Sequence, residues 1–364
     1  MVKKDKIMNA KKHLKWIDGT KFIALMAVMI DHTAGVLRYS QRIQLISFFS
    51  VSLFILISGI TAWIHEEKKQ ASSLKKYGTS IKKITYAYFG ATFFYQIFNH
   101  KFFDFSQYFY YIIHFNASGP FYFVLLYLQI LIFRQPFKVI LRKFGRDKRE
   151  VFFEGIILVI IIGISHITTF YTDILGVYGG GGKLFGGTYL ILFYVGMLIA
   201  KHRLLEETKT RAIGCTIVFG GLWFLWIYMN YKNIDSVDSF ISAGNLVNPP
   251  GMIIMLSACL VLPFSFGLFE ILNQIRISWL NRIIEGVCYV GRHTLYIFLY
   301  HNLFLEYFLS PYVMIENIWL RRVVFLIVMI GGSLMVEKLL TRLASMIKKL
   351  YDNGELQERG VEVE

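Results

Sequence analysis

Ionisable side chains lie inside long apolar segments of this chain, where they are costly and are therefore candidates for function. Lys21 and His32 belong to the segment WIDGTKFIALMAVMIDHTAG, and His301 belongs to GRHTLYIFLYHNLF. Histidine is the side chain best suited to accept and return a proton near neutral pH. The sequence therefore predicts acid–base chemistry carried out in an apolar environment.

The spacing of Lys21 and His32 gives this prediction a geometry. They are eleven residues apart in the sequence, close to three full turns of an α-helix, so they share one helix face. At 1.5 Å per residue they are separated by about 16 Å along the axis. Such a pair could hold an extended donor by its anionic end at Lys21 and present its reactive end at His32. The alternative for Lys21 is a side chain that extends to the inner lipid headgroups.

Two further residues are candidates for the same site. Asp31 precedes His32 but points about 100° away around a helix, so it orients the imidazole only where the helix bends nearby. Its alternative role is that of an interface residue near the outer mouth. His301 lies about as far from the cytoplasmic edge of its segment as His32 does, which predicts that both imidazoles reach one cavity. The alternative is that the two are unrelated and pair with neighbouring tyrosines.

Composition indicates that membrane-spanning helices position these residues. Of the 364 residues, 55% are hydrophobic and 17% are charged, which is unlike a soluble globular domain. The net charge of +15 does not indicate nucleic-acid binding, because Lys and Arg fall between apolar runs and not on one soluble face. Since a helix needs about 20 apolar residues to cross a bilayer, we predict ten spans: 17–37, 44–64, 84–99, 121–133, 151–171, 185–200, 212–229, 252–272, 287–308 and 323–343.

The distribution of positive charge predicts the topology. Lys and Arg concentrate in cytoplasmic loops, and here they cluster at the N-terminus and in the second, fourth and sixth connections between spans. We therefore predict an all-α bundle of about ten transmembrane helices with both termini in the cytoplasm. The chain then divides into a basic N-terminal segment (1–16), a transmembrane domain (17–343) and a polar C-terminal tail (344–364). The long outer connections 100–120 and 231–250 are expected to cover an acceptor site.

The residues described so far resemble the acyltransferase family 3 membrane proteins, which have ten core membrane helices. In that family a basic residue of the first span is followed eleven positions later by histidine, as Lys21 is by His32. The likeness continues through SVSLFILISGI, Lys82 and Lys83 at the third span, GPFYFVLLYLQ, FYVGMLIAKHR and VGRHTLYIFLYHN. The family usually has Arg at the position of Lys21, and Lys is a point charge that cannot form a bidentate contact.

The resemblance implies that an acetyl or similar group passes from cytoplasmic acetyl-CoA to a hydroxyl on the outer side of the membrane. The acceptor in that family is often a saccharide of the cell surface or a lipid-linked saccharide. His32 would be the general base or a transient acyl carrier, with His301 and Asp31 as further catalytic candidates. Lys21, Lys82 and Lys83 would bind the anionic donor.

The same residues leave other functions open. The cysteines Cys215, Cys259 and Cys288 lack the paired spacing of a metal site, so no metal is expected, and neither is nucleic acid. A membrane transporter or flippase for a saccharide or lipid precursor is the alternative function, since a ten-span bundle with central polar groups also lines a passage. A non-catalytic assembly or sensor protein of the envelope is a second alternative.

Overall fold

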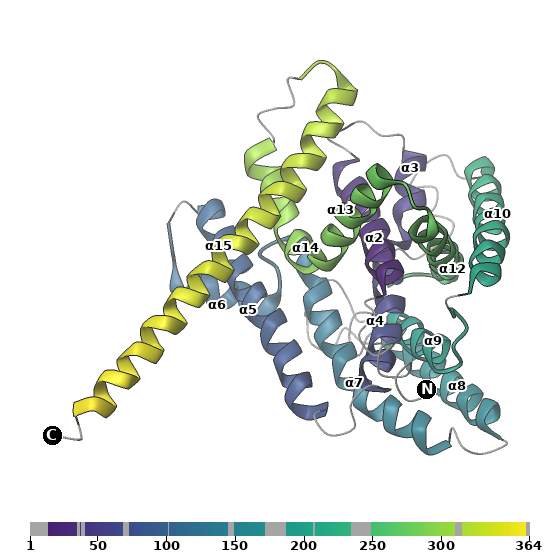
Figure 1. The fold of residues 1–364 in the computed structure, drawn as a ribbon, viewed down its shortest axis with the longest axis horizontal. Helices are drawn as coiled ribbons and strands as arrows, with labels where there is room; N and C mark the ends of the chain where they lie inside the picture. Colours follow the sequence, from purple (N-terminus) through teal and green to yellow (C-terminus); the bar gives the residue numbers. More distant parts are fainter. Residues whose placement is uncertain are drawn as a thin grey trace. The chain divides into compact units, whose positions relative to one another are not determined.

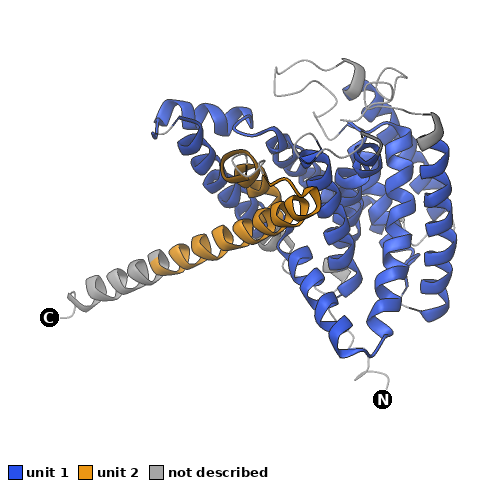
Figure 2. Cartoon of the chain, turned by 90° about the horizontal axis from the view of Figure 1, so that it is seen from above, with its two compact units in different colours: residues 1–294 blue, residues 295–364 orange. Residues whose placement is uncertain are grey.

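The computed structural model describes residues 14–34, 37, 41–67, 73–100, 102–144, 149–171, 187–206, 208–233, 249–309 and 315–361. Within these ranges all regular elements are helices, which confirms the predicted all-α class (Figure 1). The chain forms two compact units, residues 1–294 and 295–364, which Figure 2 colours separately. Residues 1–13 of the predicted N-terminal segment and most of the predicted outer connection 231–250 lie outside the described ranges.

The first unit contains most of the helices. They are α2 (Lys15–Thr33), α3 (Gln41–Ser47), α4 (Phe49–Glu67), α5 (Ser73–His100), α6 (Phe105–His114), α7 (Tyr122–Phe144), α8 (Glu150–Tyr171), α9 (Tyr189–Lys201), α10 (Lys209–Asn233), α12 (Met252–Gln274) and α13 (Ser278–Arg292). The second unit contains α14 (Thr294–Leu303) from its second residue on, a π-helical turn (Phe304–Leu309) and α15 (Ile318–Val361).

Six segments of the described chain are long and apolar enough to cross a bilayer. They are Ile43–Ile64, Gly119–Lys143, Glu150–Thr168, Lys209–Asn230, Met252–Gln274 and Ile318–Met346. Large apolar side chains on them, such as Ile217 and Phe224, are 68% and 71% exposed, as residues facing lipid are. The chain is therefore a multi-pass membrane protein. The count of ten spans and the cytoplasmic position of both termini remain predictions.

Some helix ends differ from the predicted span limits. The first helix ends at Thr33, before the predicted limit near Leu37. The predicted second span, 44–64, agrees with the apolar segment Ile43–Ile64, whose helix is interrupted at Phe48 between α3 and α4. Helix α7, which corresponds to the predicted fourth span 121–133, continues through Pro136 to Phe144. Helix α15 runs on to Val361 with no break at the start of the predicted tail.

The predicted ninth span, 287–308, was also wrong as a single helix. Its first residues belong to α13, which ends at Arg292 before His293, and α14 follows from Thr294. Helix α13 is amphipathic and buries Ile284, Cys288 and Gly291, which recur at the spacing of one helix face. The hydropathy pattern detected only its apolar C-terminal half. His301 therefore lies seven residues into its own helix, and its equal depth with His32 remains a prediction.

Helix α2 lies among several helices of the first unit. It packs against α4, α12 and α13. Thr20 Oγ1 and Ser265 Oγ of α12 are 3.0 Å apart in a buried hydrogen bond, and the rings of Trp16 and Phe266 are 5.2 Å apart in a T-shaped pair. On the α13 side, the Cα of Gly291 reaches the backbone of Asp18 so closely that a Cβ would overlap it. These contacts fix the N-terminal half of α2, which carries Lys21.

Helices α4 and α9 approach each other closely at two glycines. A Cβ at Gly59 would overlap the carbonyl oxygen of Phe193, and a Cβ at Gly196 would overlap that of Leu56. Small residues let helix backbones come this near in a membrane, where packing drives association. The α4–α9 pair is therefore a rigid part of the first unit.

Replacing Gly59 with Ala tests this packing. The added methyl group must push the two backbones apart, so we expect a loss of stability of about 1–3 kcal/mol, as for overpacked cores. The readout is the melting temperature of the purified protein in detergent. Gly221→Ala is the matched control, because nothing lies within 4 Å of a Cβ there. Equal melting temperatures for the two variants would contradict the close approach.

Candidate functional site

Helix α2 carries Lys21, Asp31 and His32. It is one continuous helix from Lys15 to Thr33, so the predicted shared face and the separation of about 16 Å between Lys21 and His32 follow directly from helix geometry. The His32 side chain is 25% exposed, which leaves the imidazole accessible. The helix thus holds a cation near its N-terminal end and an imidazole near its C-terminal end.

Charged side chains gather around Lys21. The ammonium interacts electrostatically with Asp18, three residues earlier on α2, and with Lys83 of α5. Asp18 is only 2% exposed, and its Oδ2 also lies 3.8 Å from an Arg292 guanidinium nitrogen of α13. We call Asp18, Lys21, Lys83 and Arg292 the inner charge cluster. It contains three cations and one anion, so it carries a net positive charge.

This composition favours an anionic ligand. The like charges of Lys21 and Lys83 repel each other, and an anion placed between them relieves that repulsion. Lys83 is exposed, as is its neighbour Lys82 on α5. Of the three lysines predicted to bind a donor, the structure brings Lys83 within electrostatic reach of Lys21. Arg292 and the buried Asp18 were missed, because their contact joins α2 to α13, a helix that the sequence prediction did not separate from α14.

At the other end of α2, Asp31 lies between two side chains. Its Oδ2 is 4.0 Å from His32 Nε2, and its Oδ1 accepts a hydrogen bond of 2.9 Å from Gln44 Nε2 of α3. The predicted angle of 100° therefore does not keep the carboxylate away from the imidazole, because the Asp31 side chain leans across the last turn of α2. Gln44 was missed by the sequence analysis, which treated it only as the start of a span.

His301 lies in the second unit and is fully buried. Its Nδ1 is 2.8 Å from the carbonyl oxygen of Phe298 and 3.2 Å from that of Ile297. A carbonyl oxygen only accepts, so Nδ1 carries the proton in the neutral ring and Nε2 is the basic nitrogen. A π-helical turn begins at Phe304, a feature often found at functional sites. The cavity predicted to join His301 to His32 remains a prediction.

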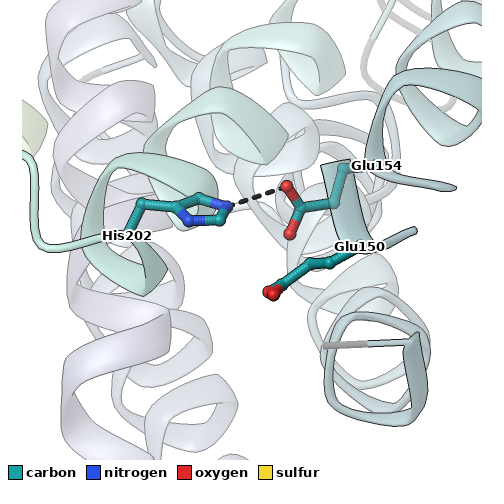
Figure 3. A group of neighbouring side chains, drawn as sticks. All are labelled: Glu150, Glu154 and His202. Atoms are coloured by element: carbon teal, nitrogen blue, oxygen red, sulfur yellow. Dashed lines mark hydrogen bonds and ion pairs between the residues drawn. The ribbon is translucent and has the colours of Figure 1, made fainter. Parts of the chain in front are cut away.

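A second group of titratable residues joins α8 to α9, as Figure 3 shows. The Glu154 carboxylate accepts from Lys201 Nζ at 2.5 Å and from His202 Nε2 at 2.8 Å. Lys201 also contacts Glu150 Oε1 at 2.6 Å. The Glu154 and Lys201 side chains are only 7% and 9% exposed. Glu154 was not among the predicted site residues, although an acidic residue inside an apolar run indicates a functional role or a charged partner.

Glu150, Glu154 and His202 have the geometry of a three-ligand metal site, with ligand atoms within 4.8 Å of one another. However, the Lys201 ammonium contacts both carboxylates and supplies the positive charge that a metal ion would bring. A metal ion would have to displace this lysine. The arrangement is therefore better explained as a buried ion-pair network that fastens α8 to α9.

Comparison with known proteins adds one finding. Residues 14–338 match the family described as acyltransferase domain, of the acyltransferase 3 type. No curated protein and no solved structure matches the chain. The matched range begins one residue before α2 and ends within α15, and it includes both ends of the Lys21–His32 pair.

Lys201→Met tests the ion-pair network. The substitution leaves the buried Glu154 carboxylate without its closest cation, so we expect a loss of about 3 kcal/mol or more in stability. The readout is again the melting temperature in detergent. Lys209→Met, at an exposed lysine of α10, serves as the control. If both variants melted like the wild type, the network would contribute nothing to the α8–α9 contact.

Proposed function

This chain belongs to the acyltransferase 3 family, and we propose that it transfers an acetyl group from cytoplasmic acetyl-CoA to a hydroxyl of a cell-surface or lipid-linked saccharide. One observation carries the proposal. A single continuous helix holds a basic anchor, Lys21, and a proton acceptor, His32, about 16 Å apart on one face. An extended donor needs both features at such a separation.

The inner charge cluster supports binding of the donor. Coenzyme A carries several phosphate charges, and Lys21 and Lys83 supply two cations within electrostatic reach of each other. Lys82 is exposed beside Lys83 on α5. It adds a third positive charge to those of Lys21 and Lys83. The buried Asp18, itself close to Arg292, keeps a countercharge near Lys21 when no donor is present.

The chemistry at the other end of α2 is a transesterification. His32 takes the proton of the acceptor hydroxyl while the hydroxyl oxygen bonds to the thioester carbonyl carbon. The C–S bond then breaks, and the proton passes from the imidazolium to the departing CoA thiolate. The Asp31 carboxylate, 4.0 Å from the ring, stabilises the imidazolium that forms between these events.

His32 as an acyl carrier is the second form of the mechanism. In that form the imidazole nitrogen bonds to the carbonyl carbon, CoA leaves as the thiol, and the acceptor oxygen displaces histidine in a second step. His301, whose basic nitrogen is Nε2, is the candidate for the proton transfers that His32 then cannot perform. The saccharide acceptor rests on the family resemblance and on the outward course expected for the end of α2.

Replacing His32 with Ala is the first test of the function. We expect acetyl transfer, followed as release of free CoA by the purified protein with acetyl-CoA and a saccharide acceptor, to fall by about 10²-fold or more. His166→Ala, at an exposed histidine of α8, should keep wild-type activity. A transporter would release no CoA in either case, so the absence of turnover by the folded wild type would overturn the proposal.

A second test concerns the anchor for the donor. Lys21→Met removes one cation facing the donor phosphates, so we expect the KM for acetyl-CoA to rise about tenfold, in line with the loss of one charged hydrogen bond. The kcat should change much less, because Lys21 lies far from the reacting atoms. Lys21→Arg should restore most of the affinity. An unchanged KM for Lys21→Met would mean that the donor lies elsewhere.

A further inference from the structure

Two side chains contact Asp31 in the arrangement described above. That of His32 belongs to the same helix, and that of Gln44 comes from another helix, α3. Gln44 Nε2 donates a hydrogen bond of 2.9 Å to Asp31 Oδ1, across the junction between α2 and α3, which pack against each other. The opposite oxygen, Oδ2, is the one that lies 4.0 Å from His32 Nε2. Each oxygen of the carboxylate is thus directed to a different partner.

From this arrangement we propose that Gln44 is a positioning residue for acetyl transfer, which holds the Asp31 carboxylate so that it faces the His32 imidazole. The proposal rests on the proposed function, because it assigns Gln44 a role in the proton transfer at His32. It adds a residue from the second membrane segment to the Asp31–His32 pair at the end of α2.

The need for such a residue follows from the geometry of α2. Consecutive helical residues point about 100° apart, so Asp31 approaches His32 only when its side chain leans toward the end of the helix. The Asp31 side chain is 28% exposed, and water would compete for it in other rotamers. A hydrogen bond to one carboxylate oxygen selects the rotamer that directs the second oxygen to the imidazole.

The chemical type of Gln44 suits this purpose. An ionised carboxylate only accepts hydrogen bonds, so the amide must present its NH₂ group to it. The amide carries no charge, so it holds Asp31 without neutralising it, and the full negative charge stays available to the imidazolium. A Lys or Arg at this position would hold the carboxylate equally well but would compete with His32 for its charge.

The division of the second span places Gln44 where it is needed. A turn at Phe48 separates α3, which carries Gln44, from α4. The Ser47 hydroxyl donates to the Gln44 carbonyl oxygen at 2.7 Å, which closes the last turn of α3. Helix α3 packs against α2, and this packing brings Gln44 beside Asp31.

Gln44→Met tests the proposal, since methionine has a similar length and lacks the donor. We expect kcat for acetyl transfer to fall about tenfold, the loss typical of one hydrogen bond to a charged group. The KM for acetyl-CoA should stay at the wild-type value. Gln44 lies on α3, beside the end of α2 that is opposite to Lys21. Ile43→Ala, at the exposed residue beside it on α3, should leave kcat and the melting temperature unchanged.

A double-mutant cycle separates positioning from a structural role. If Gln44 acts through Asp31, Gln44→Met should lower kcat no further in an Asp31→Asn background, where the negative charge is already gone. Additive losses in the double variant, or a wild-type kcat for Gln44→Met, would overturn the role of Gln44 while leaving the His32 result intact. Failure of the proposed function is distinguishable, because the wild type would then release no CoA at all.

Discussion

A charged side chain that leaves water must be matched by an opposite charge or by hydrogen-bond donors, and this requirement governs the site of this membrane protein. Helix α2 carries three such side chains, Asp18, Lys21 and Asp31, among largely apolar neighbours. Asp18 lies near Lys21 of the same helix and near Arg292 of α13, and Asp31 accepts a hydrogen bond from Gln44 of α3. Lys83 of α5 has the same charge as Lys21, so it does not match that charge and leaves positive charge in excess at this end of α2. The two carboxylates of α2 therefore favour α13 and α3 as its neighbours. The same requirement explains the contact of Glu154 with Lys201 and His202, which joins α8 to α9.

The two ends of α2 meet this requirement in different ways, and the difference matches their proposed roles. At the N-terminal end, one buried anion faces several cations, so positive charge is left over for an anionic donor. At the C-terminal end, Asp31 accepts a hydrogen bond from the neutral amide of Gln44, so its negative charge is left over for the imidazolium of His32. A positive anchor and a site that stabilises a developing positive charge are thus kept about 16 Å apart by one helix.

Much of the fold was predictable from the sequence because it depends on local composition. Apolar runs identified the helical class and most spans, and the eleven-residue spacing placed Lys21 and His32 on one face before any tertiary contact was known. Hydropathy failed where a helix is amphipathic, because it merged α13 with α14 across His293. It identified the apolar segment Ile43–Ile64 as one span but gave no sign of the turn at Phe48 inside it. Gln44, Asp18 and Arg292 were missed for the related reason that their roles depend on contacts between helices, which no periodicity in the chain reveals.

The central claim is that α2 spans the length of the bound donor, with its phosphates at Lys21 and its acyl group at His32. The most direct measurement is an experimental structure of the protein bound to an acetyl-CoA analogue whose thioester sulfur is replaced by a methylene group. The account predicts phosphate oxygens within contact of Lys21 and Lys83, and the acyl carbonyl carbon beside the His32 imidazole. An analogue bound with its acyl group away from His32, or with its phosphates away from the inner charge cluster, would contradict the account.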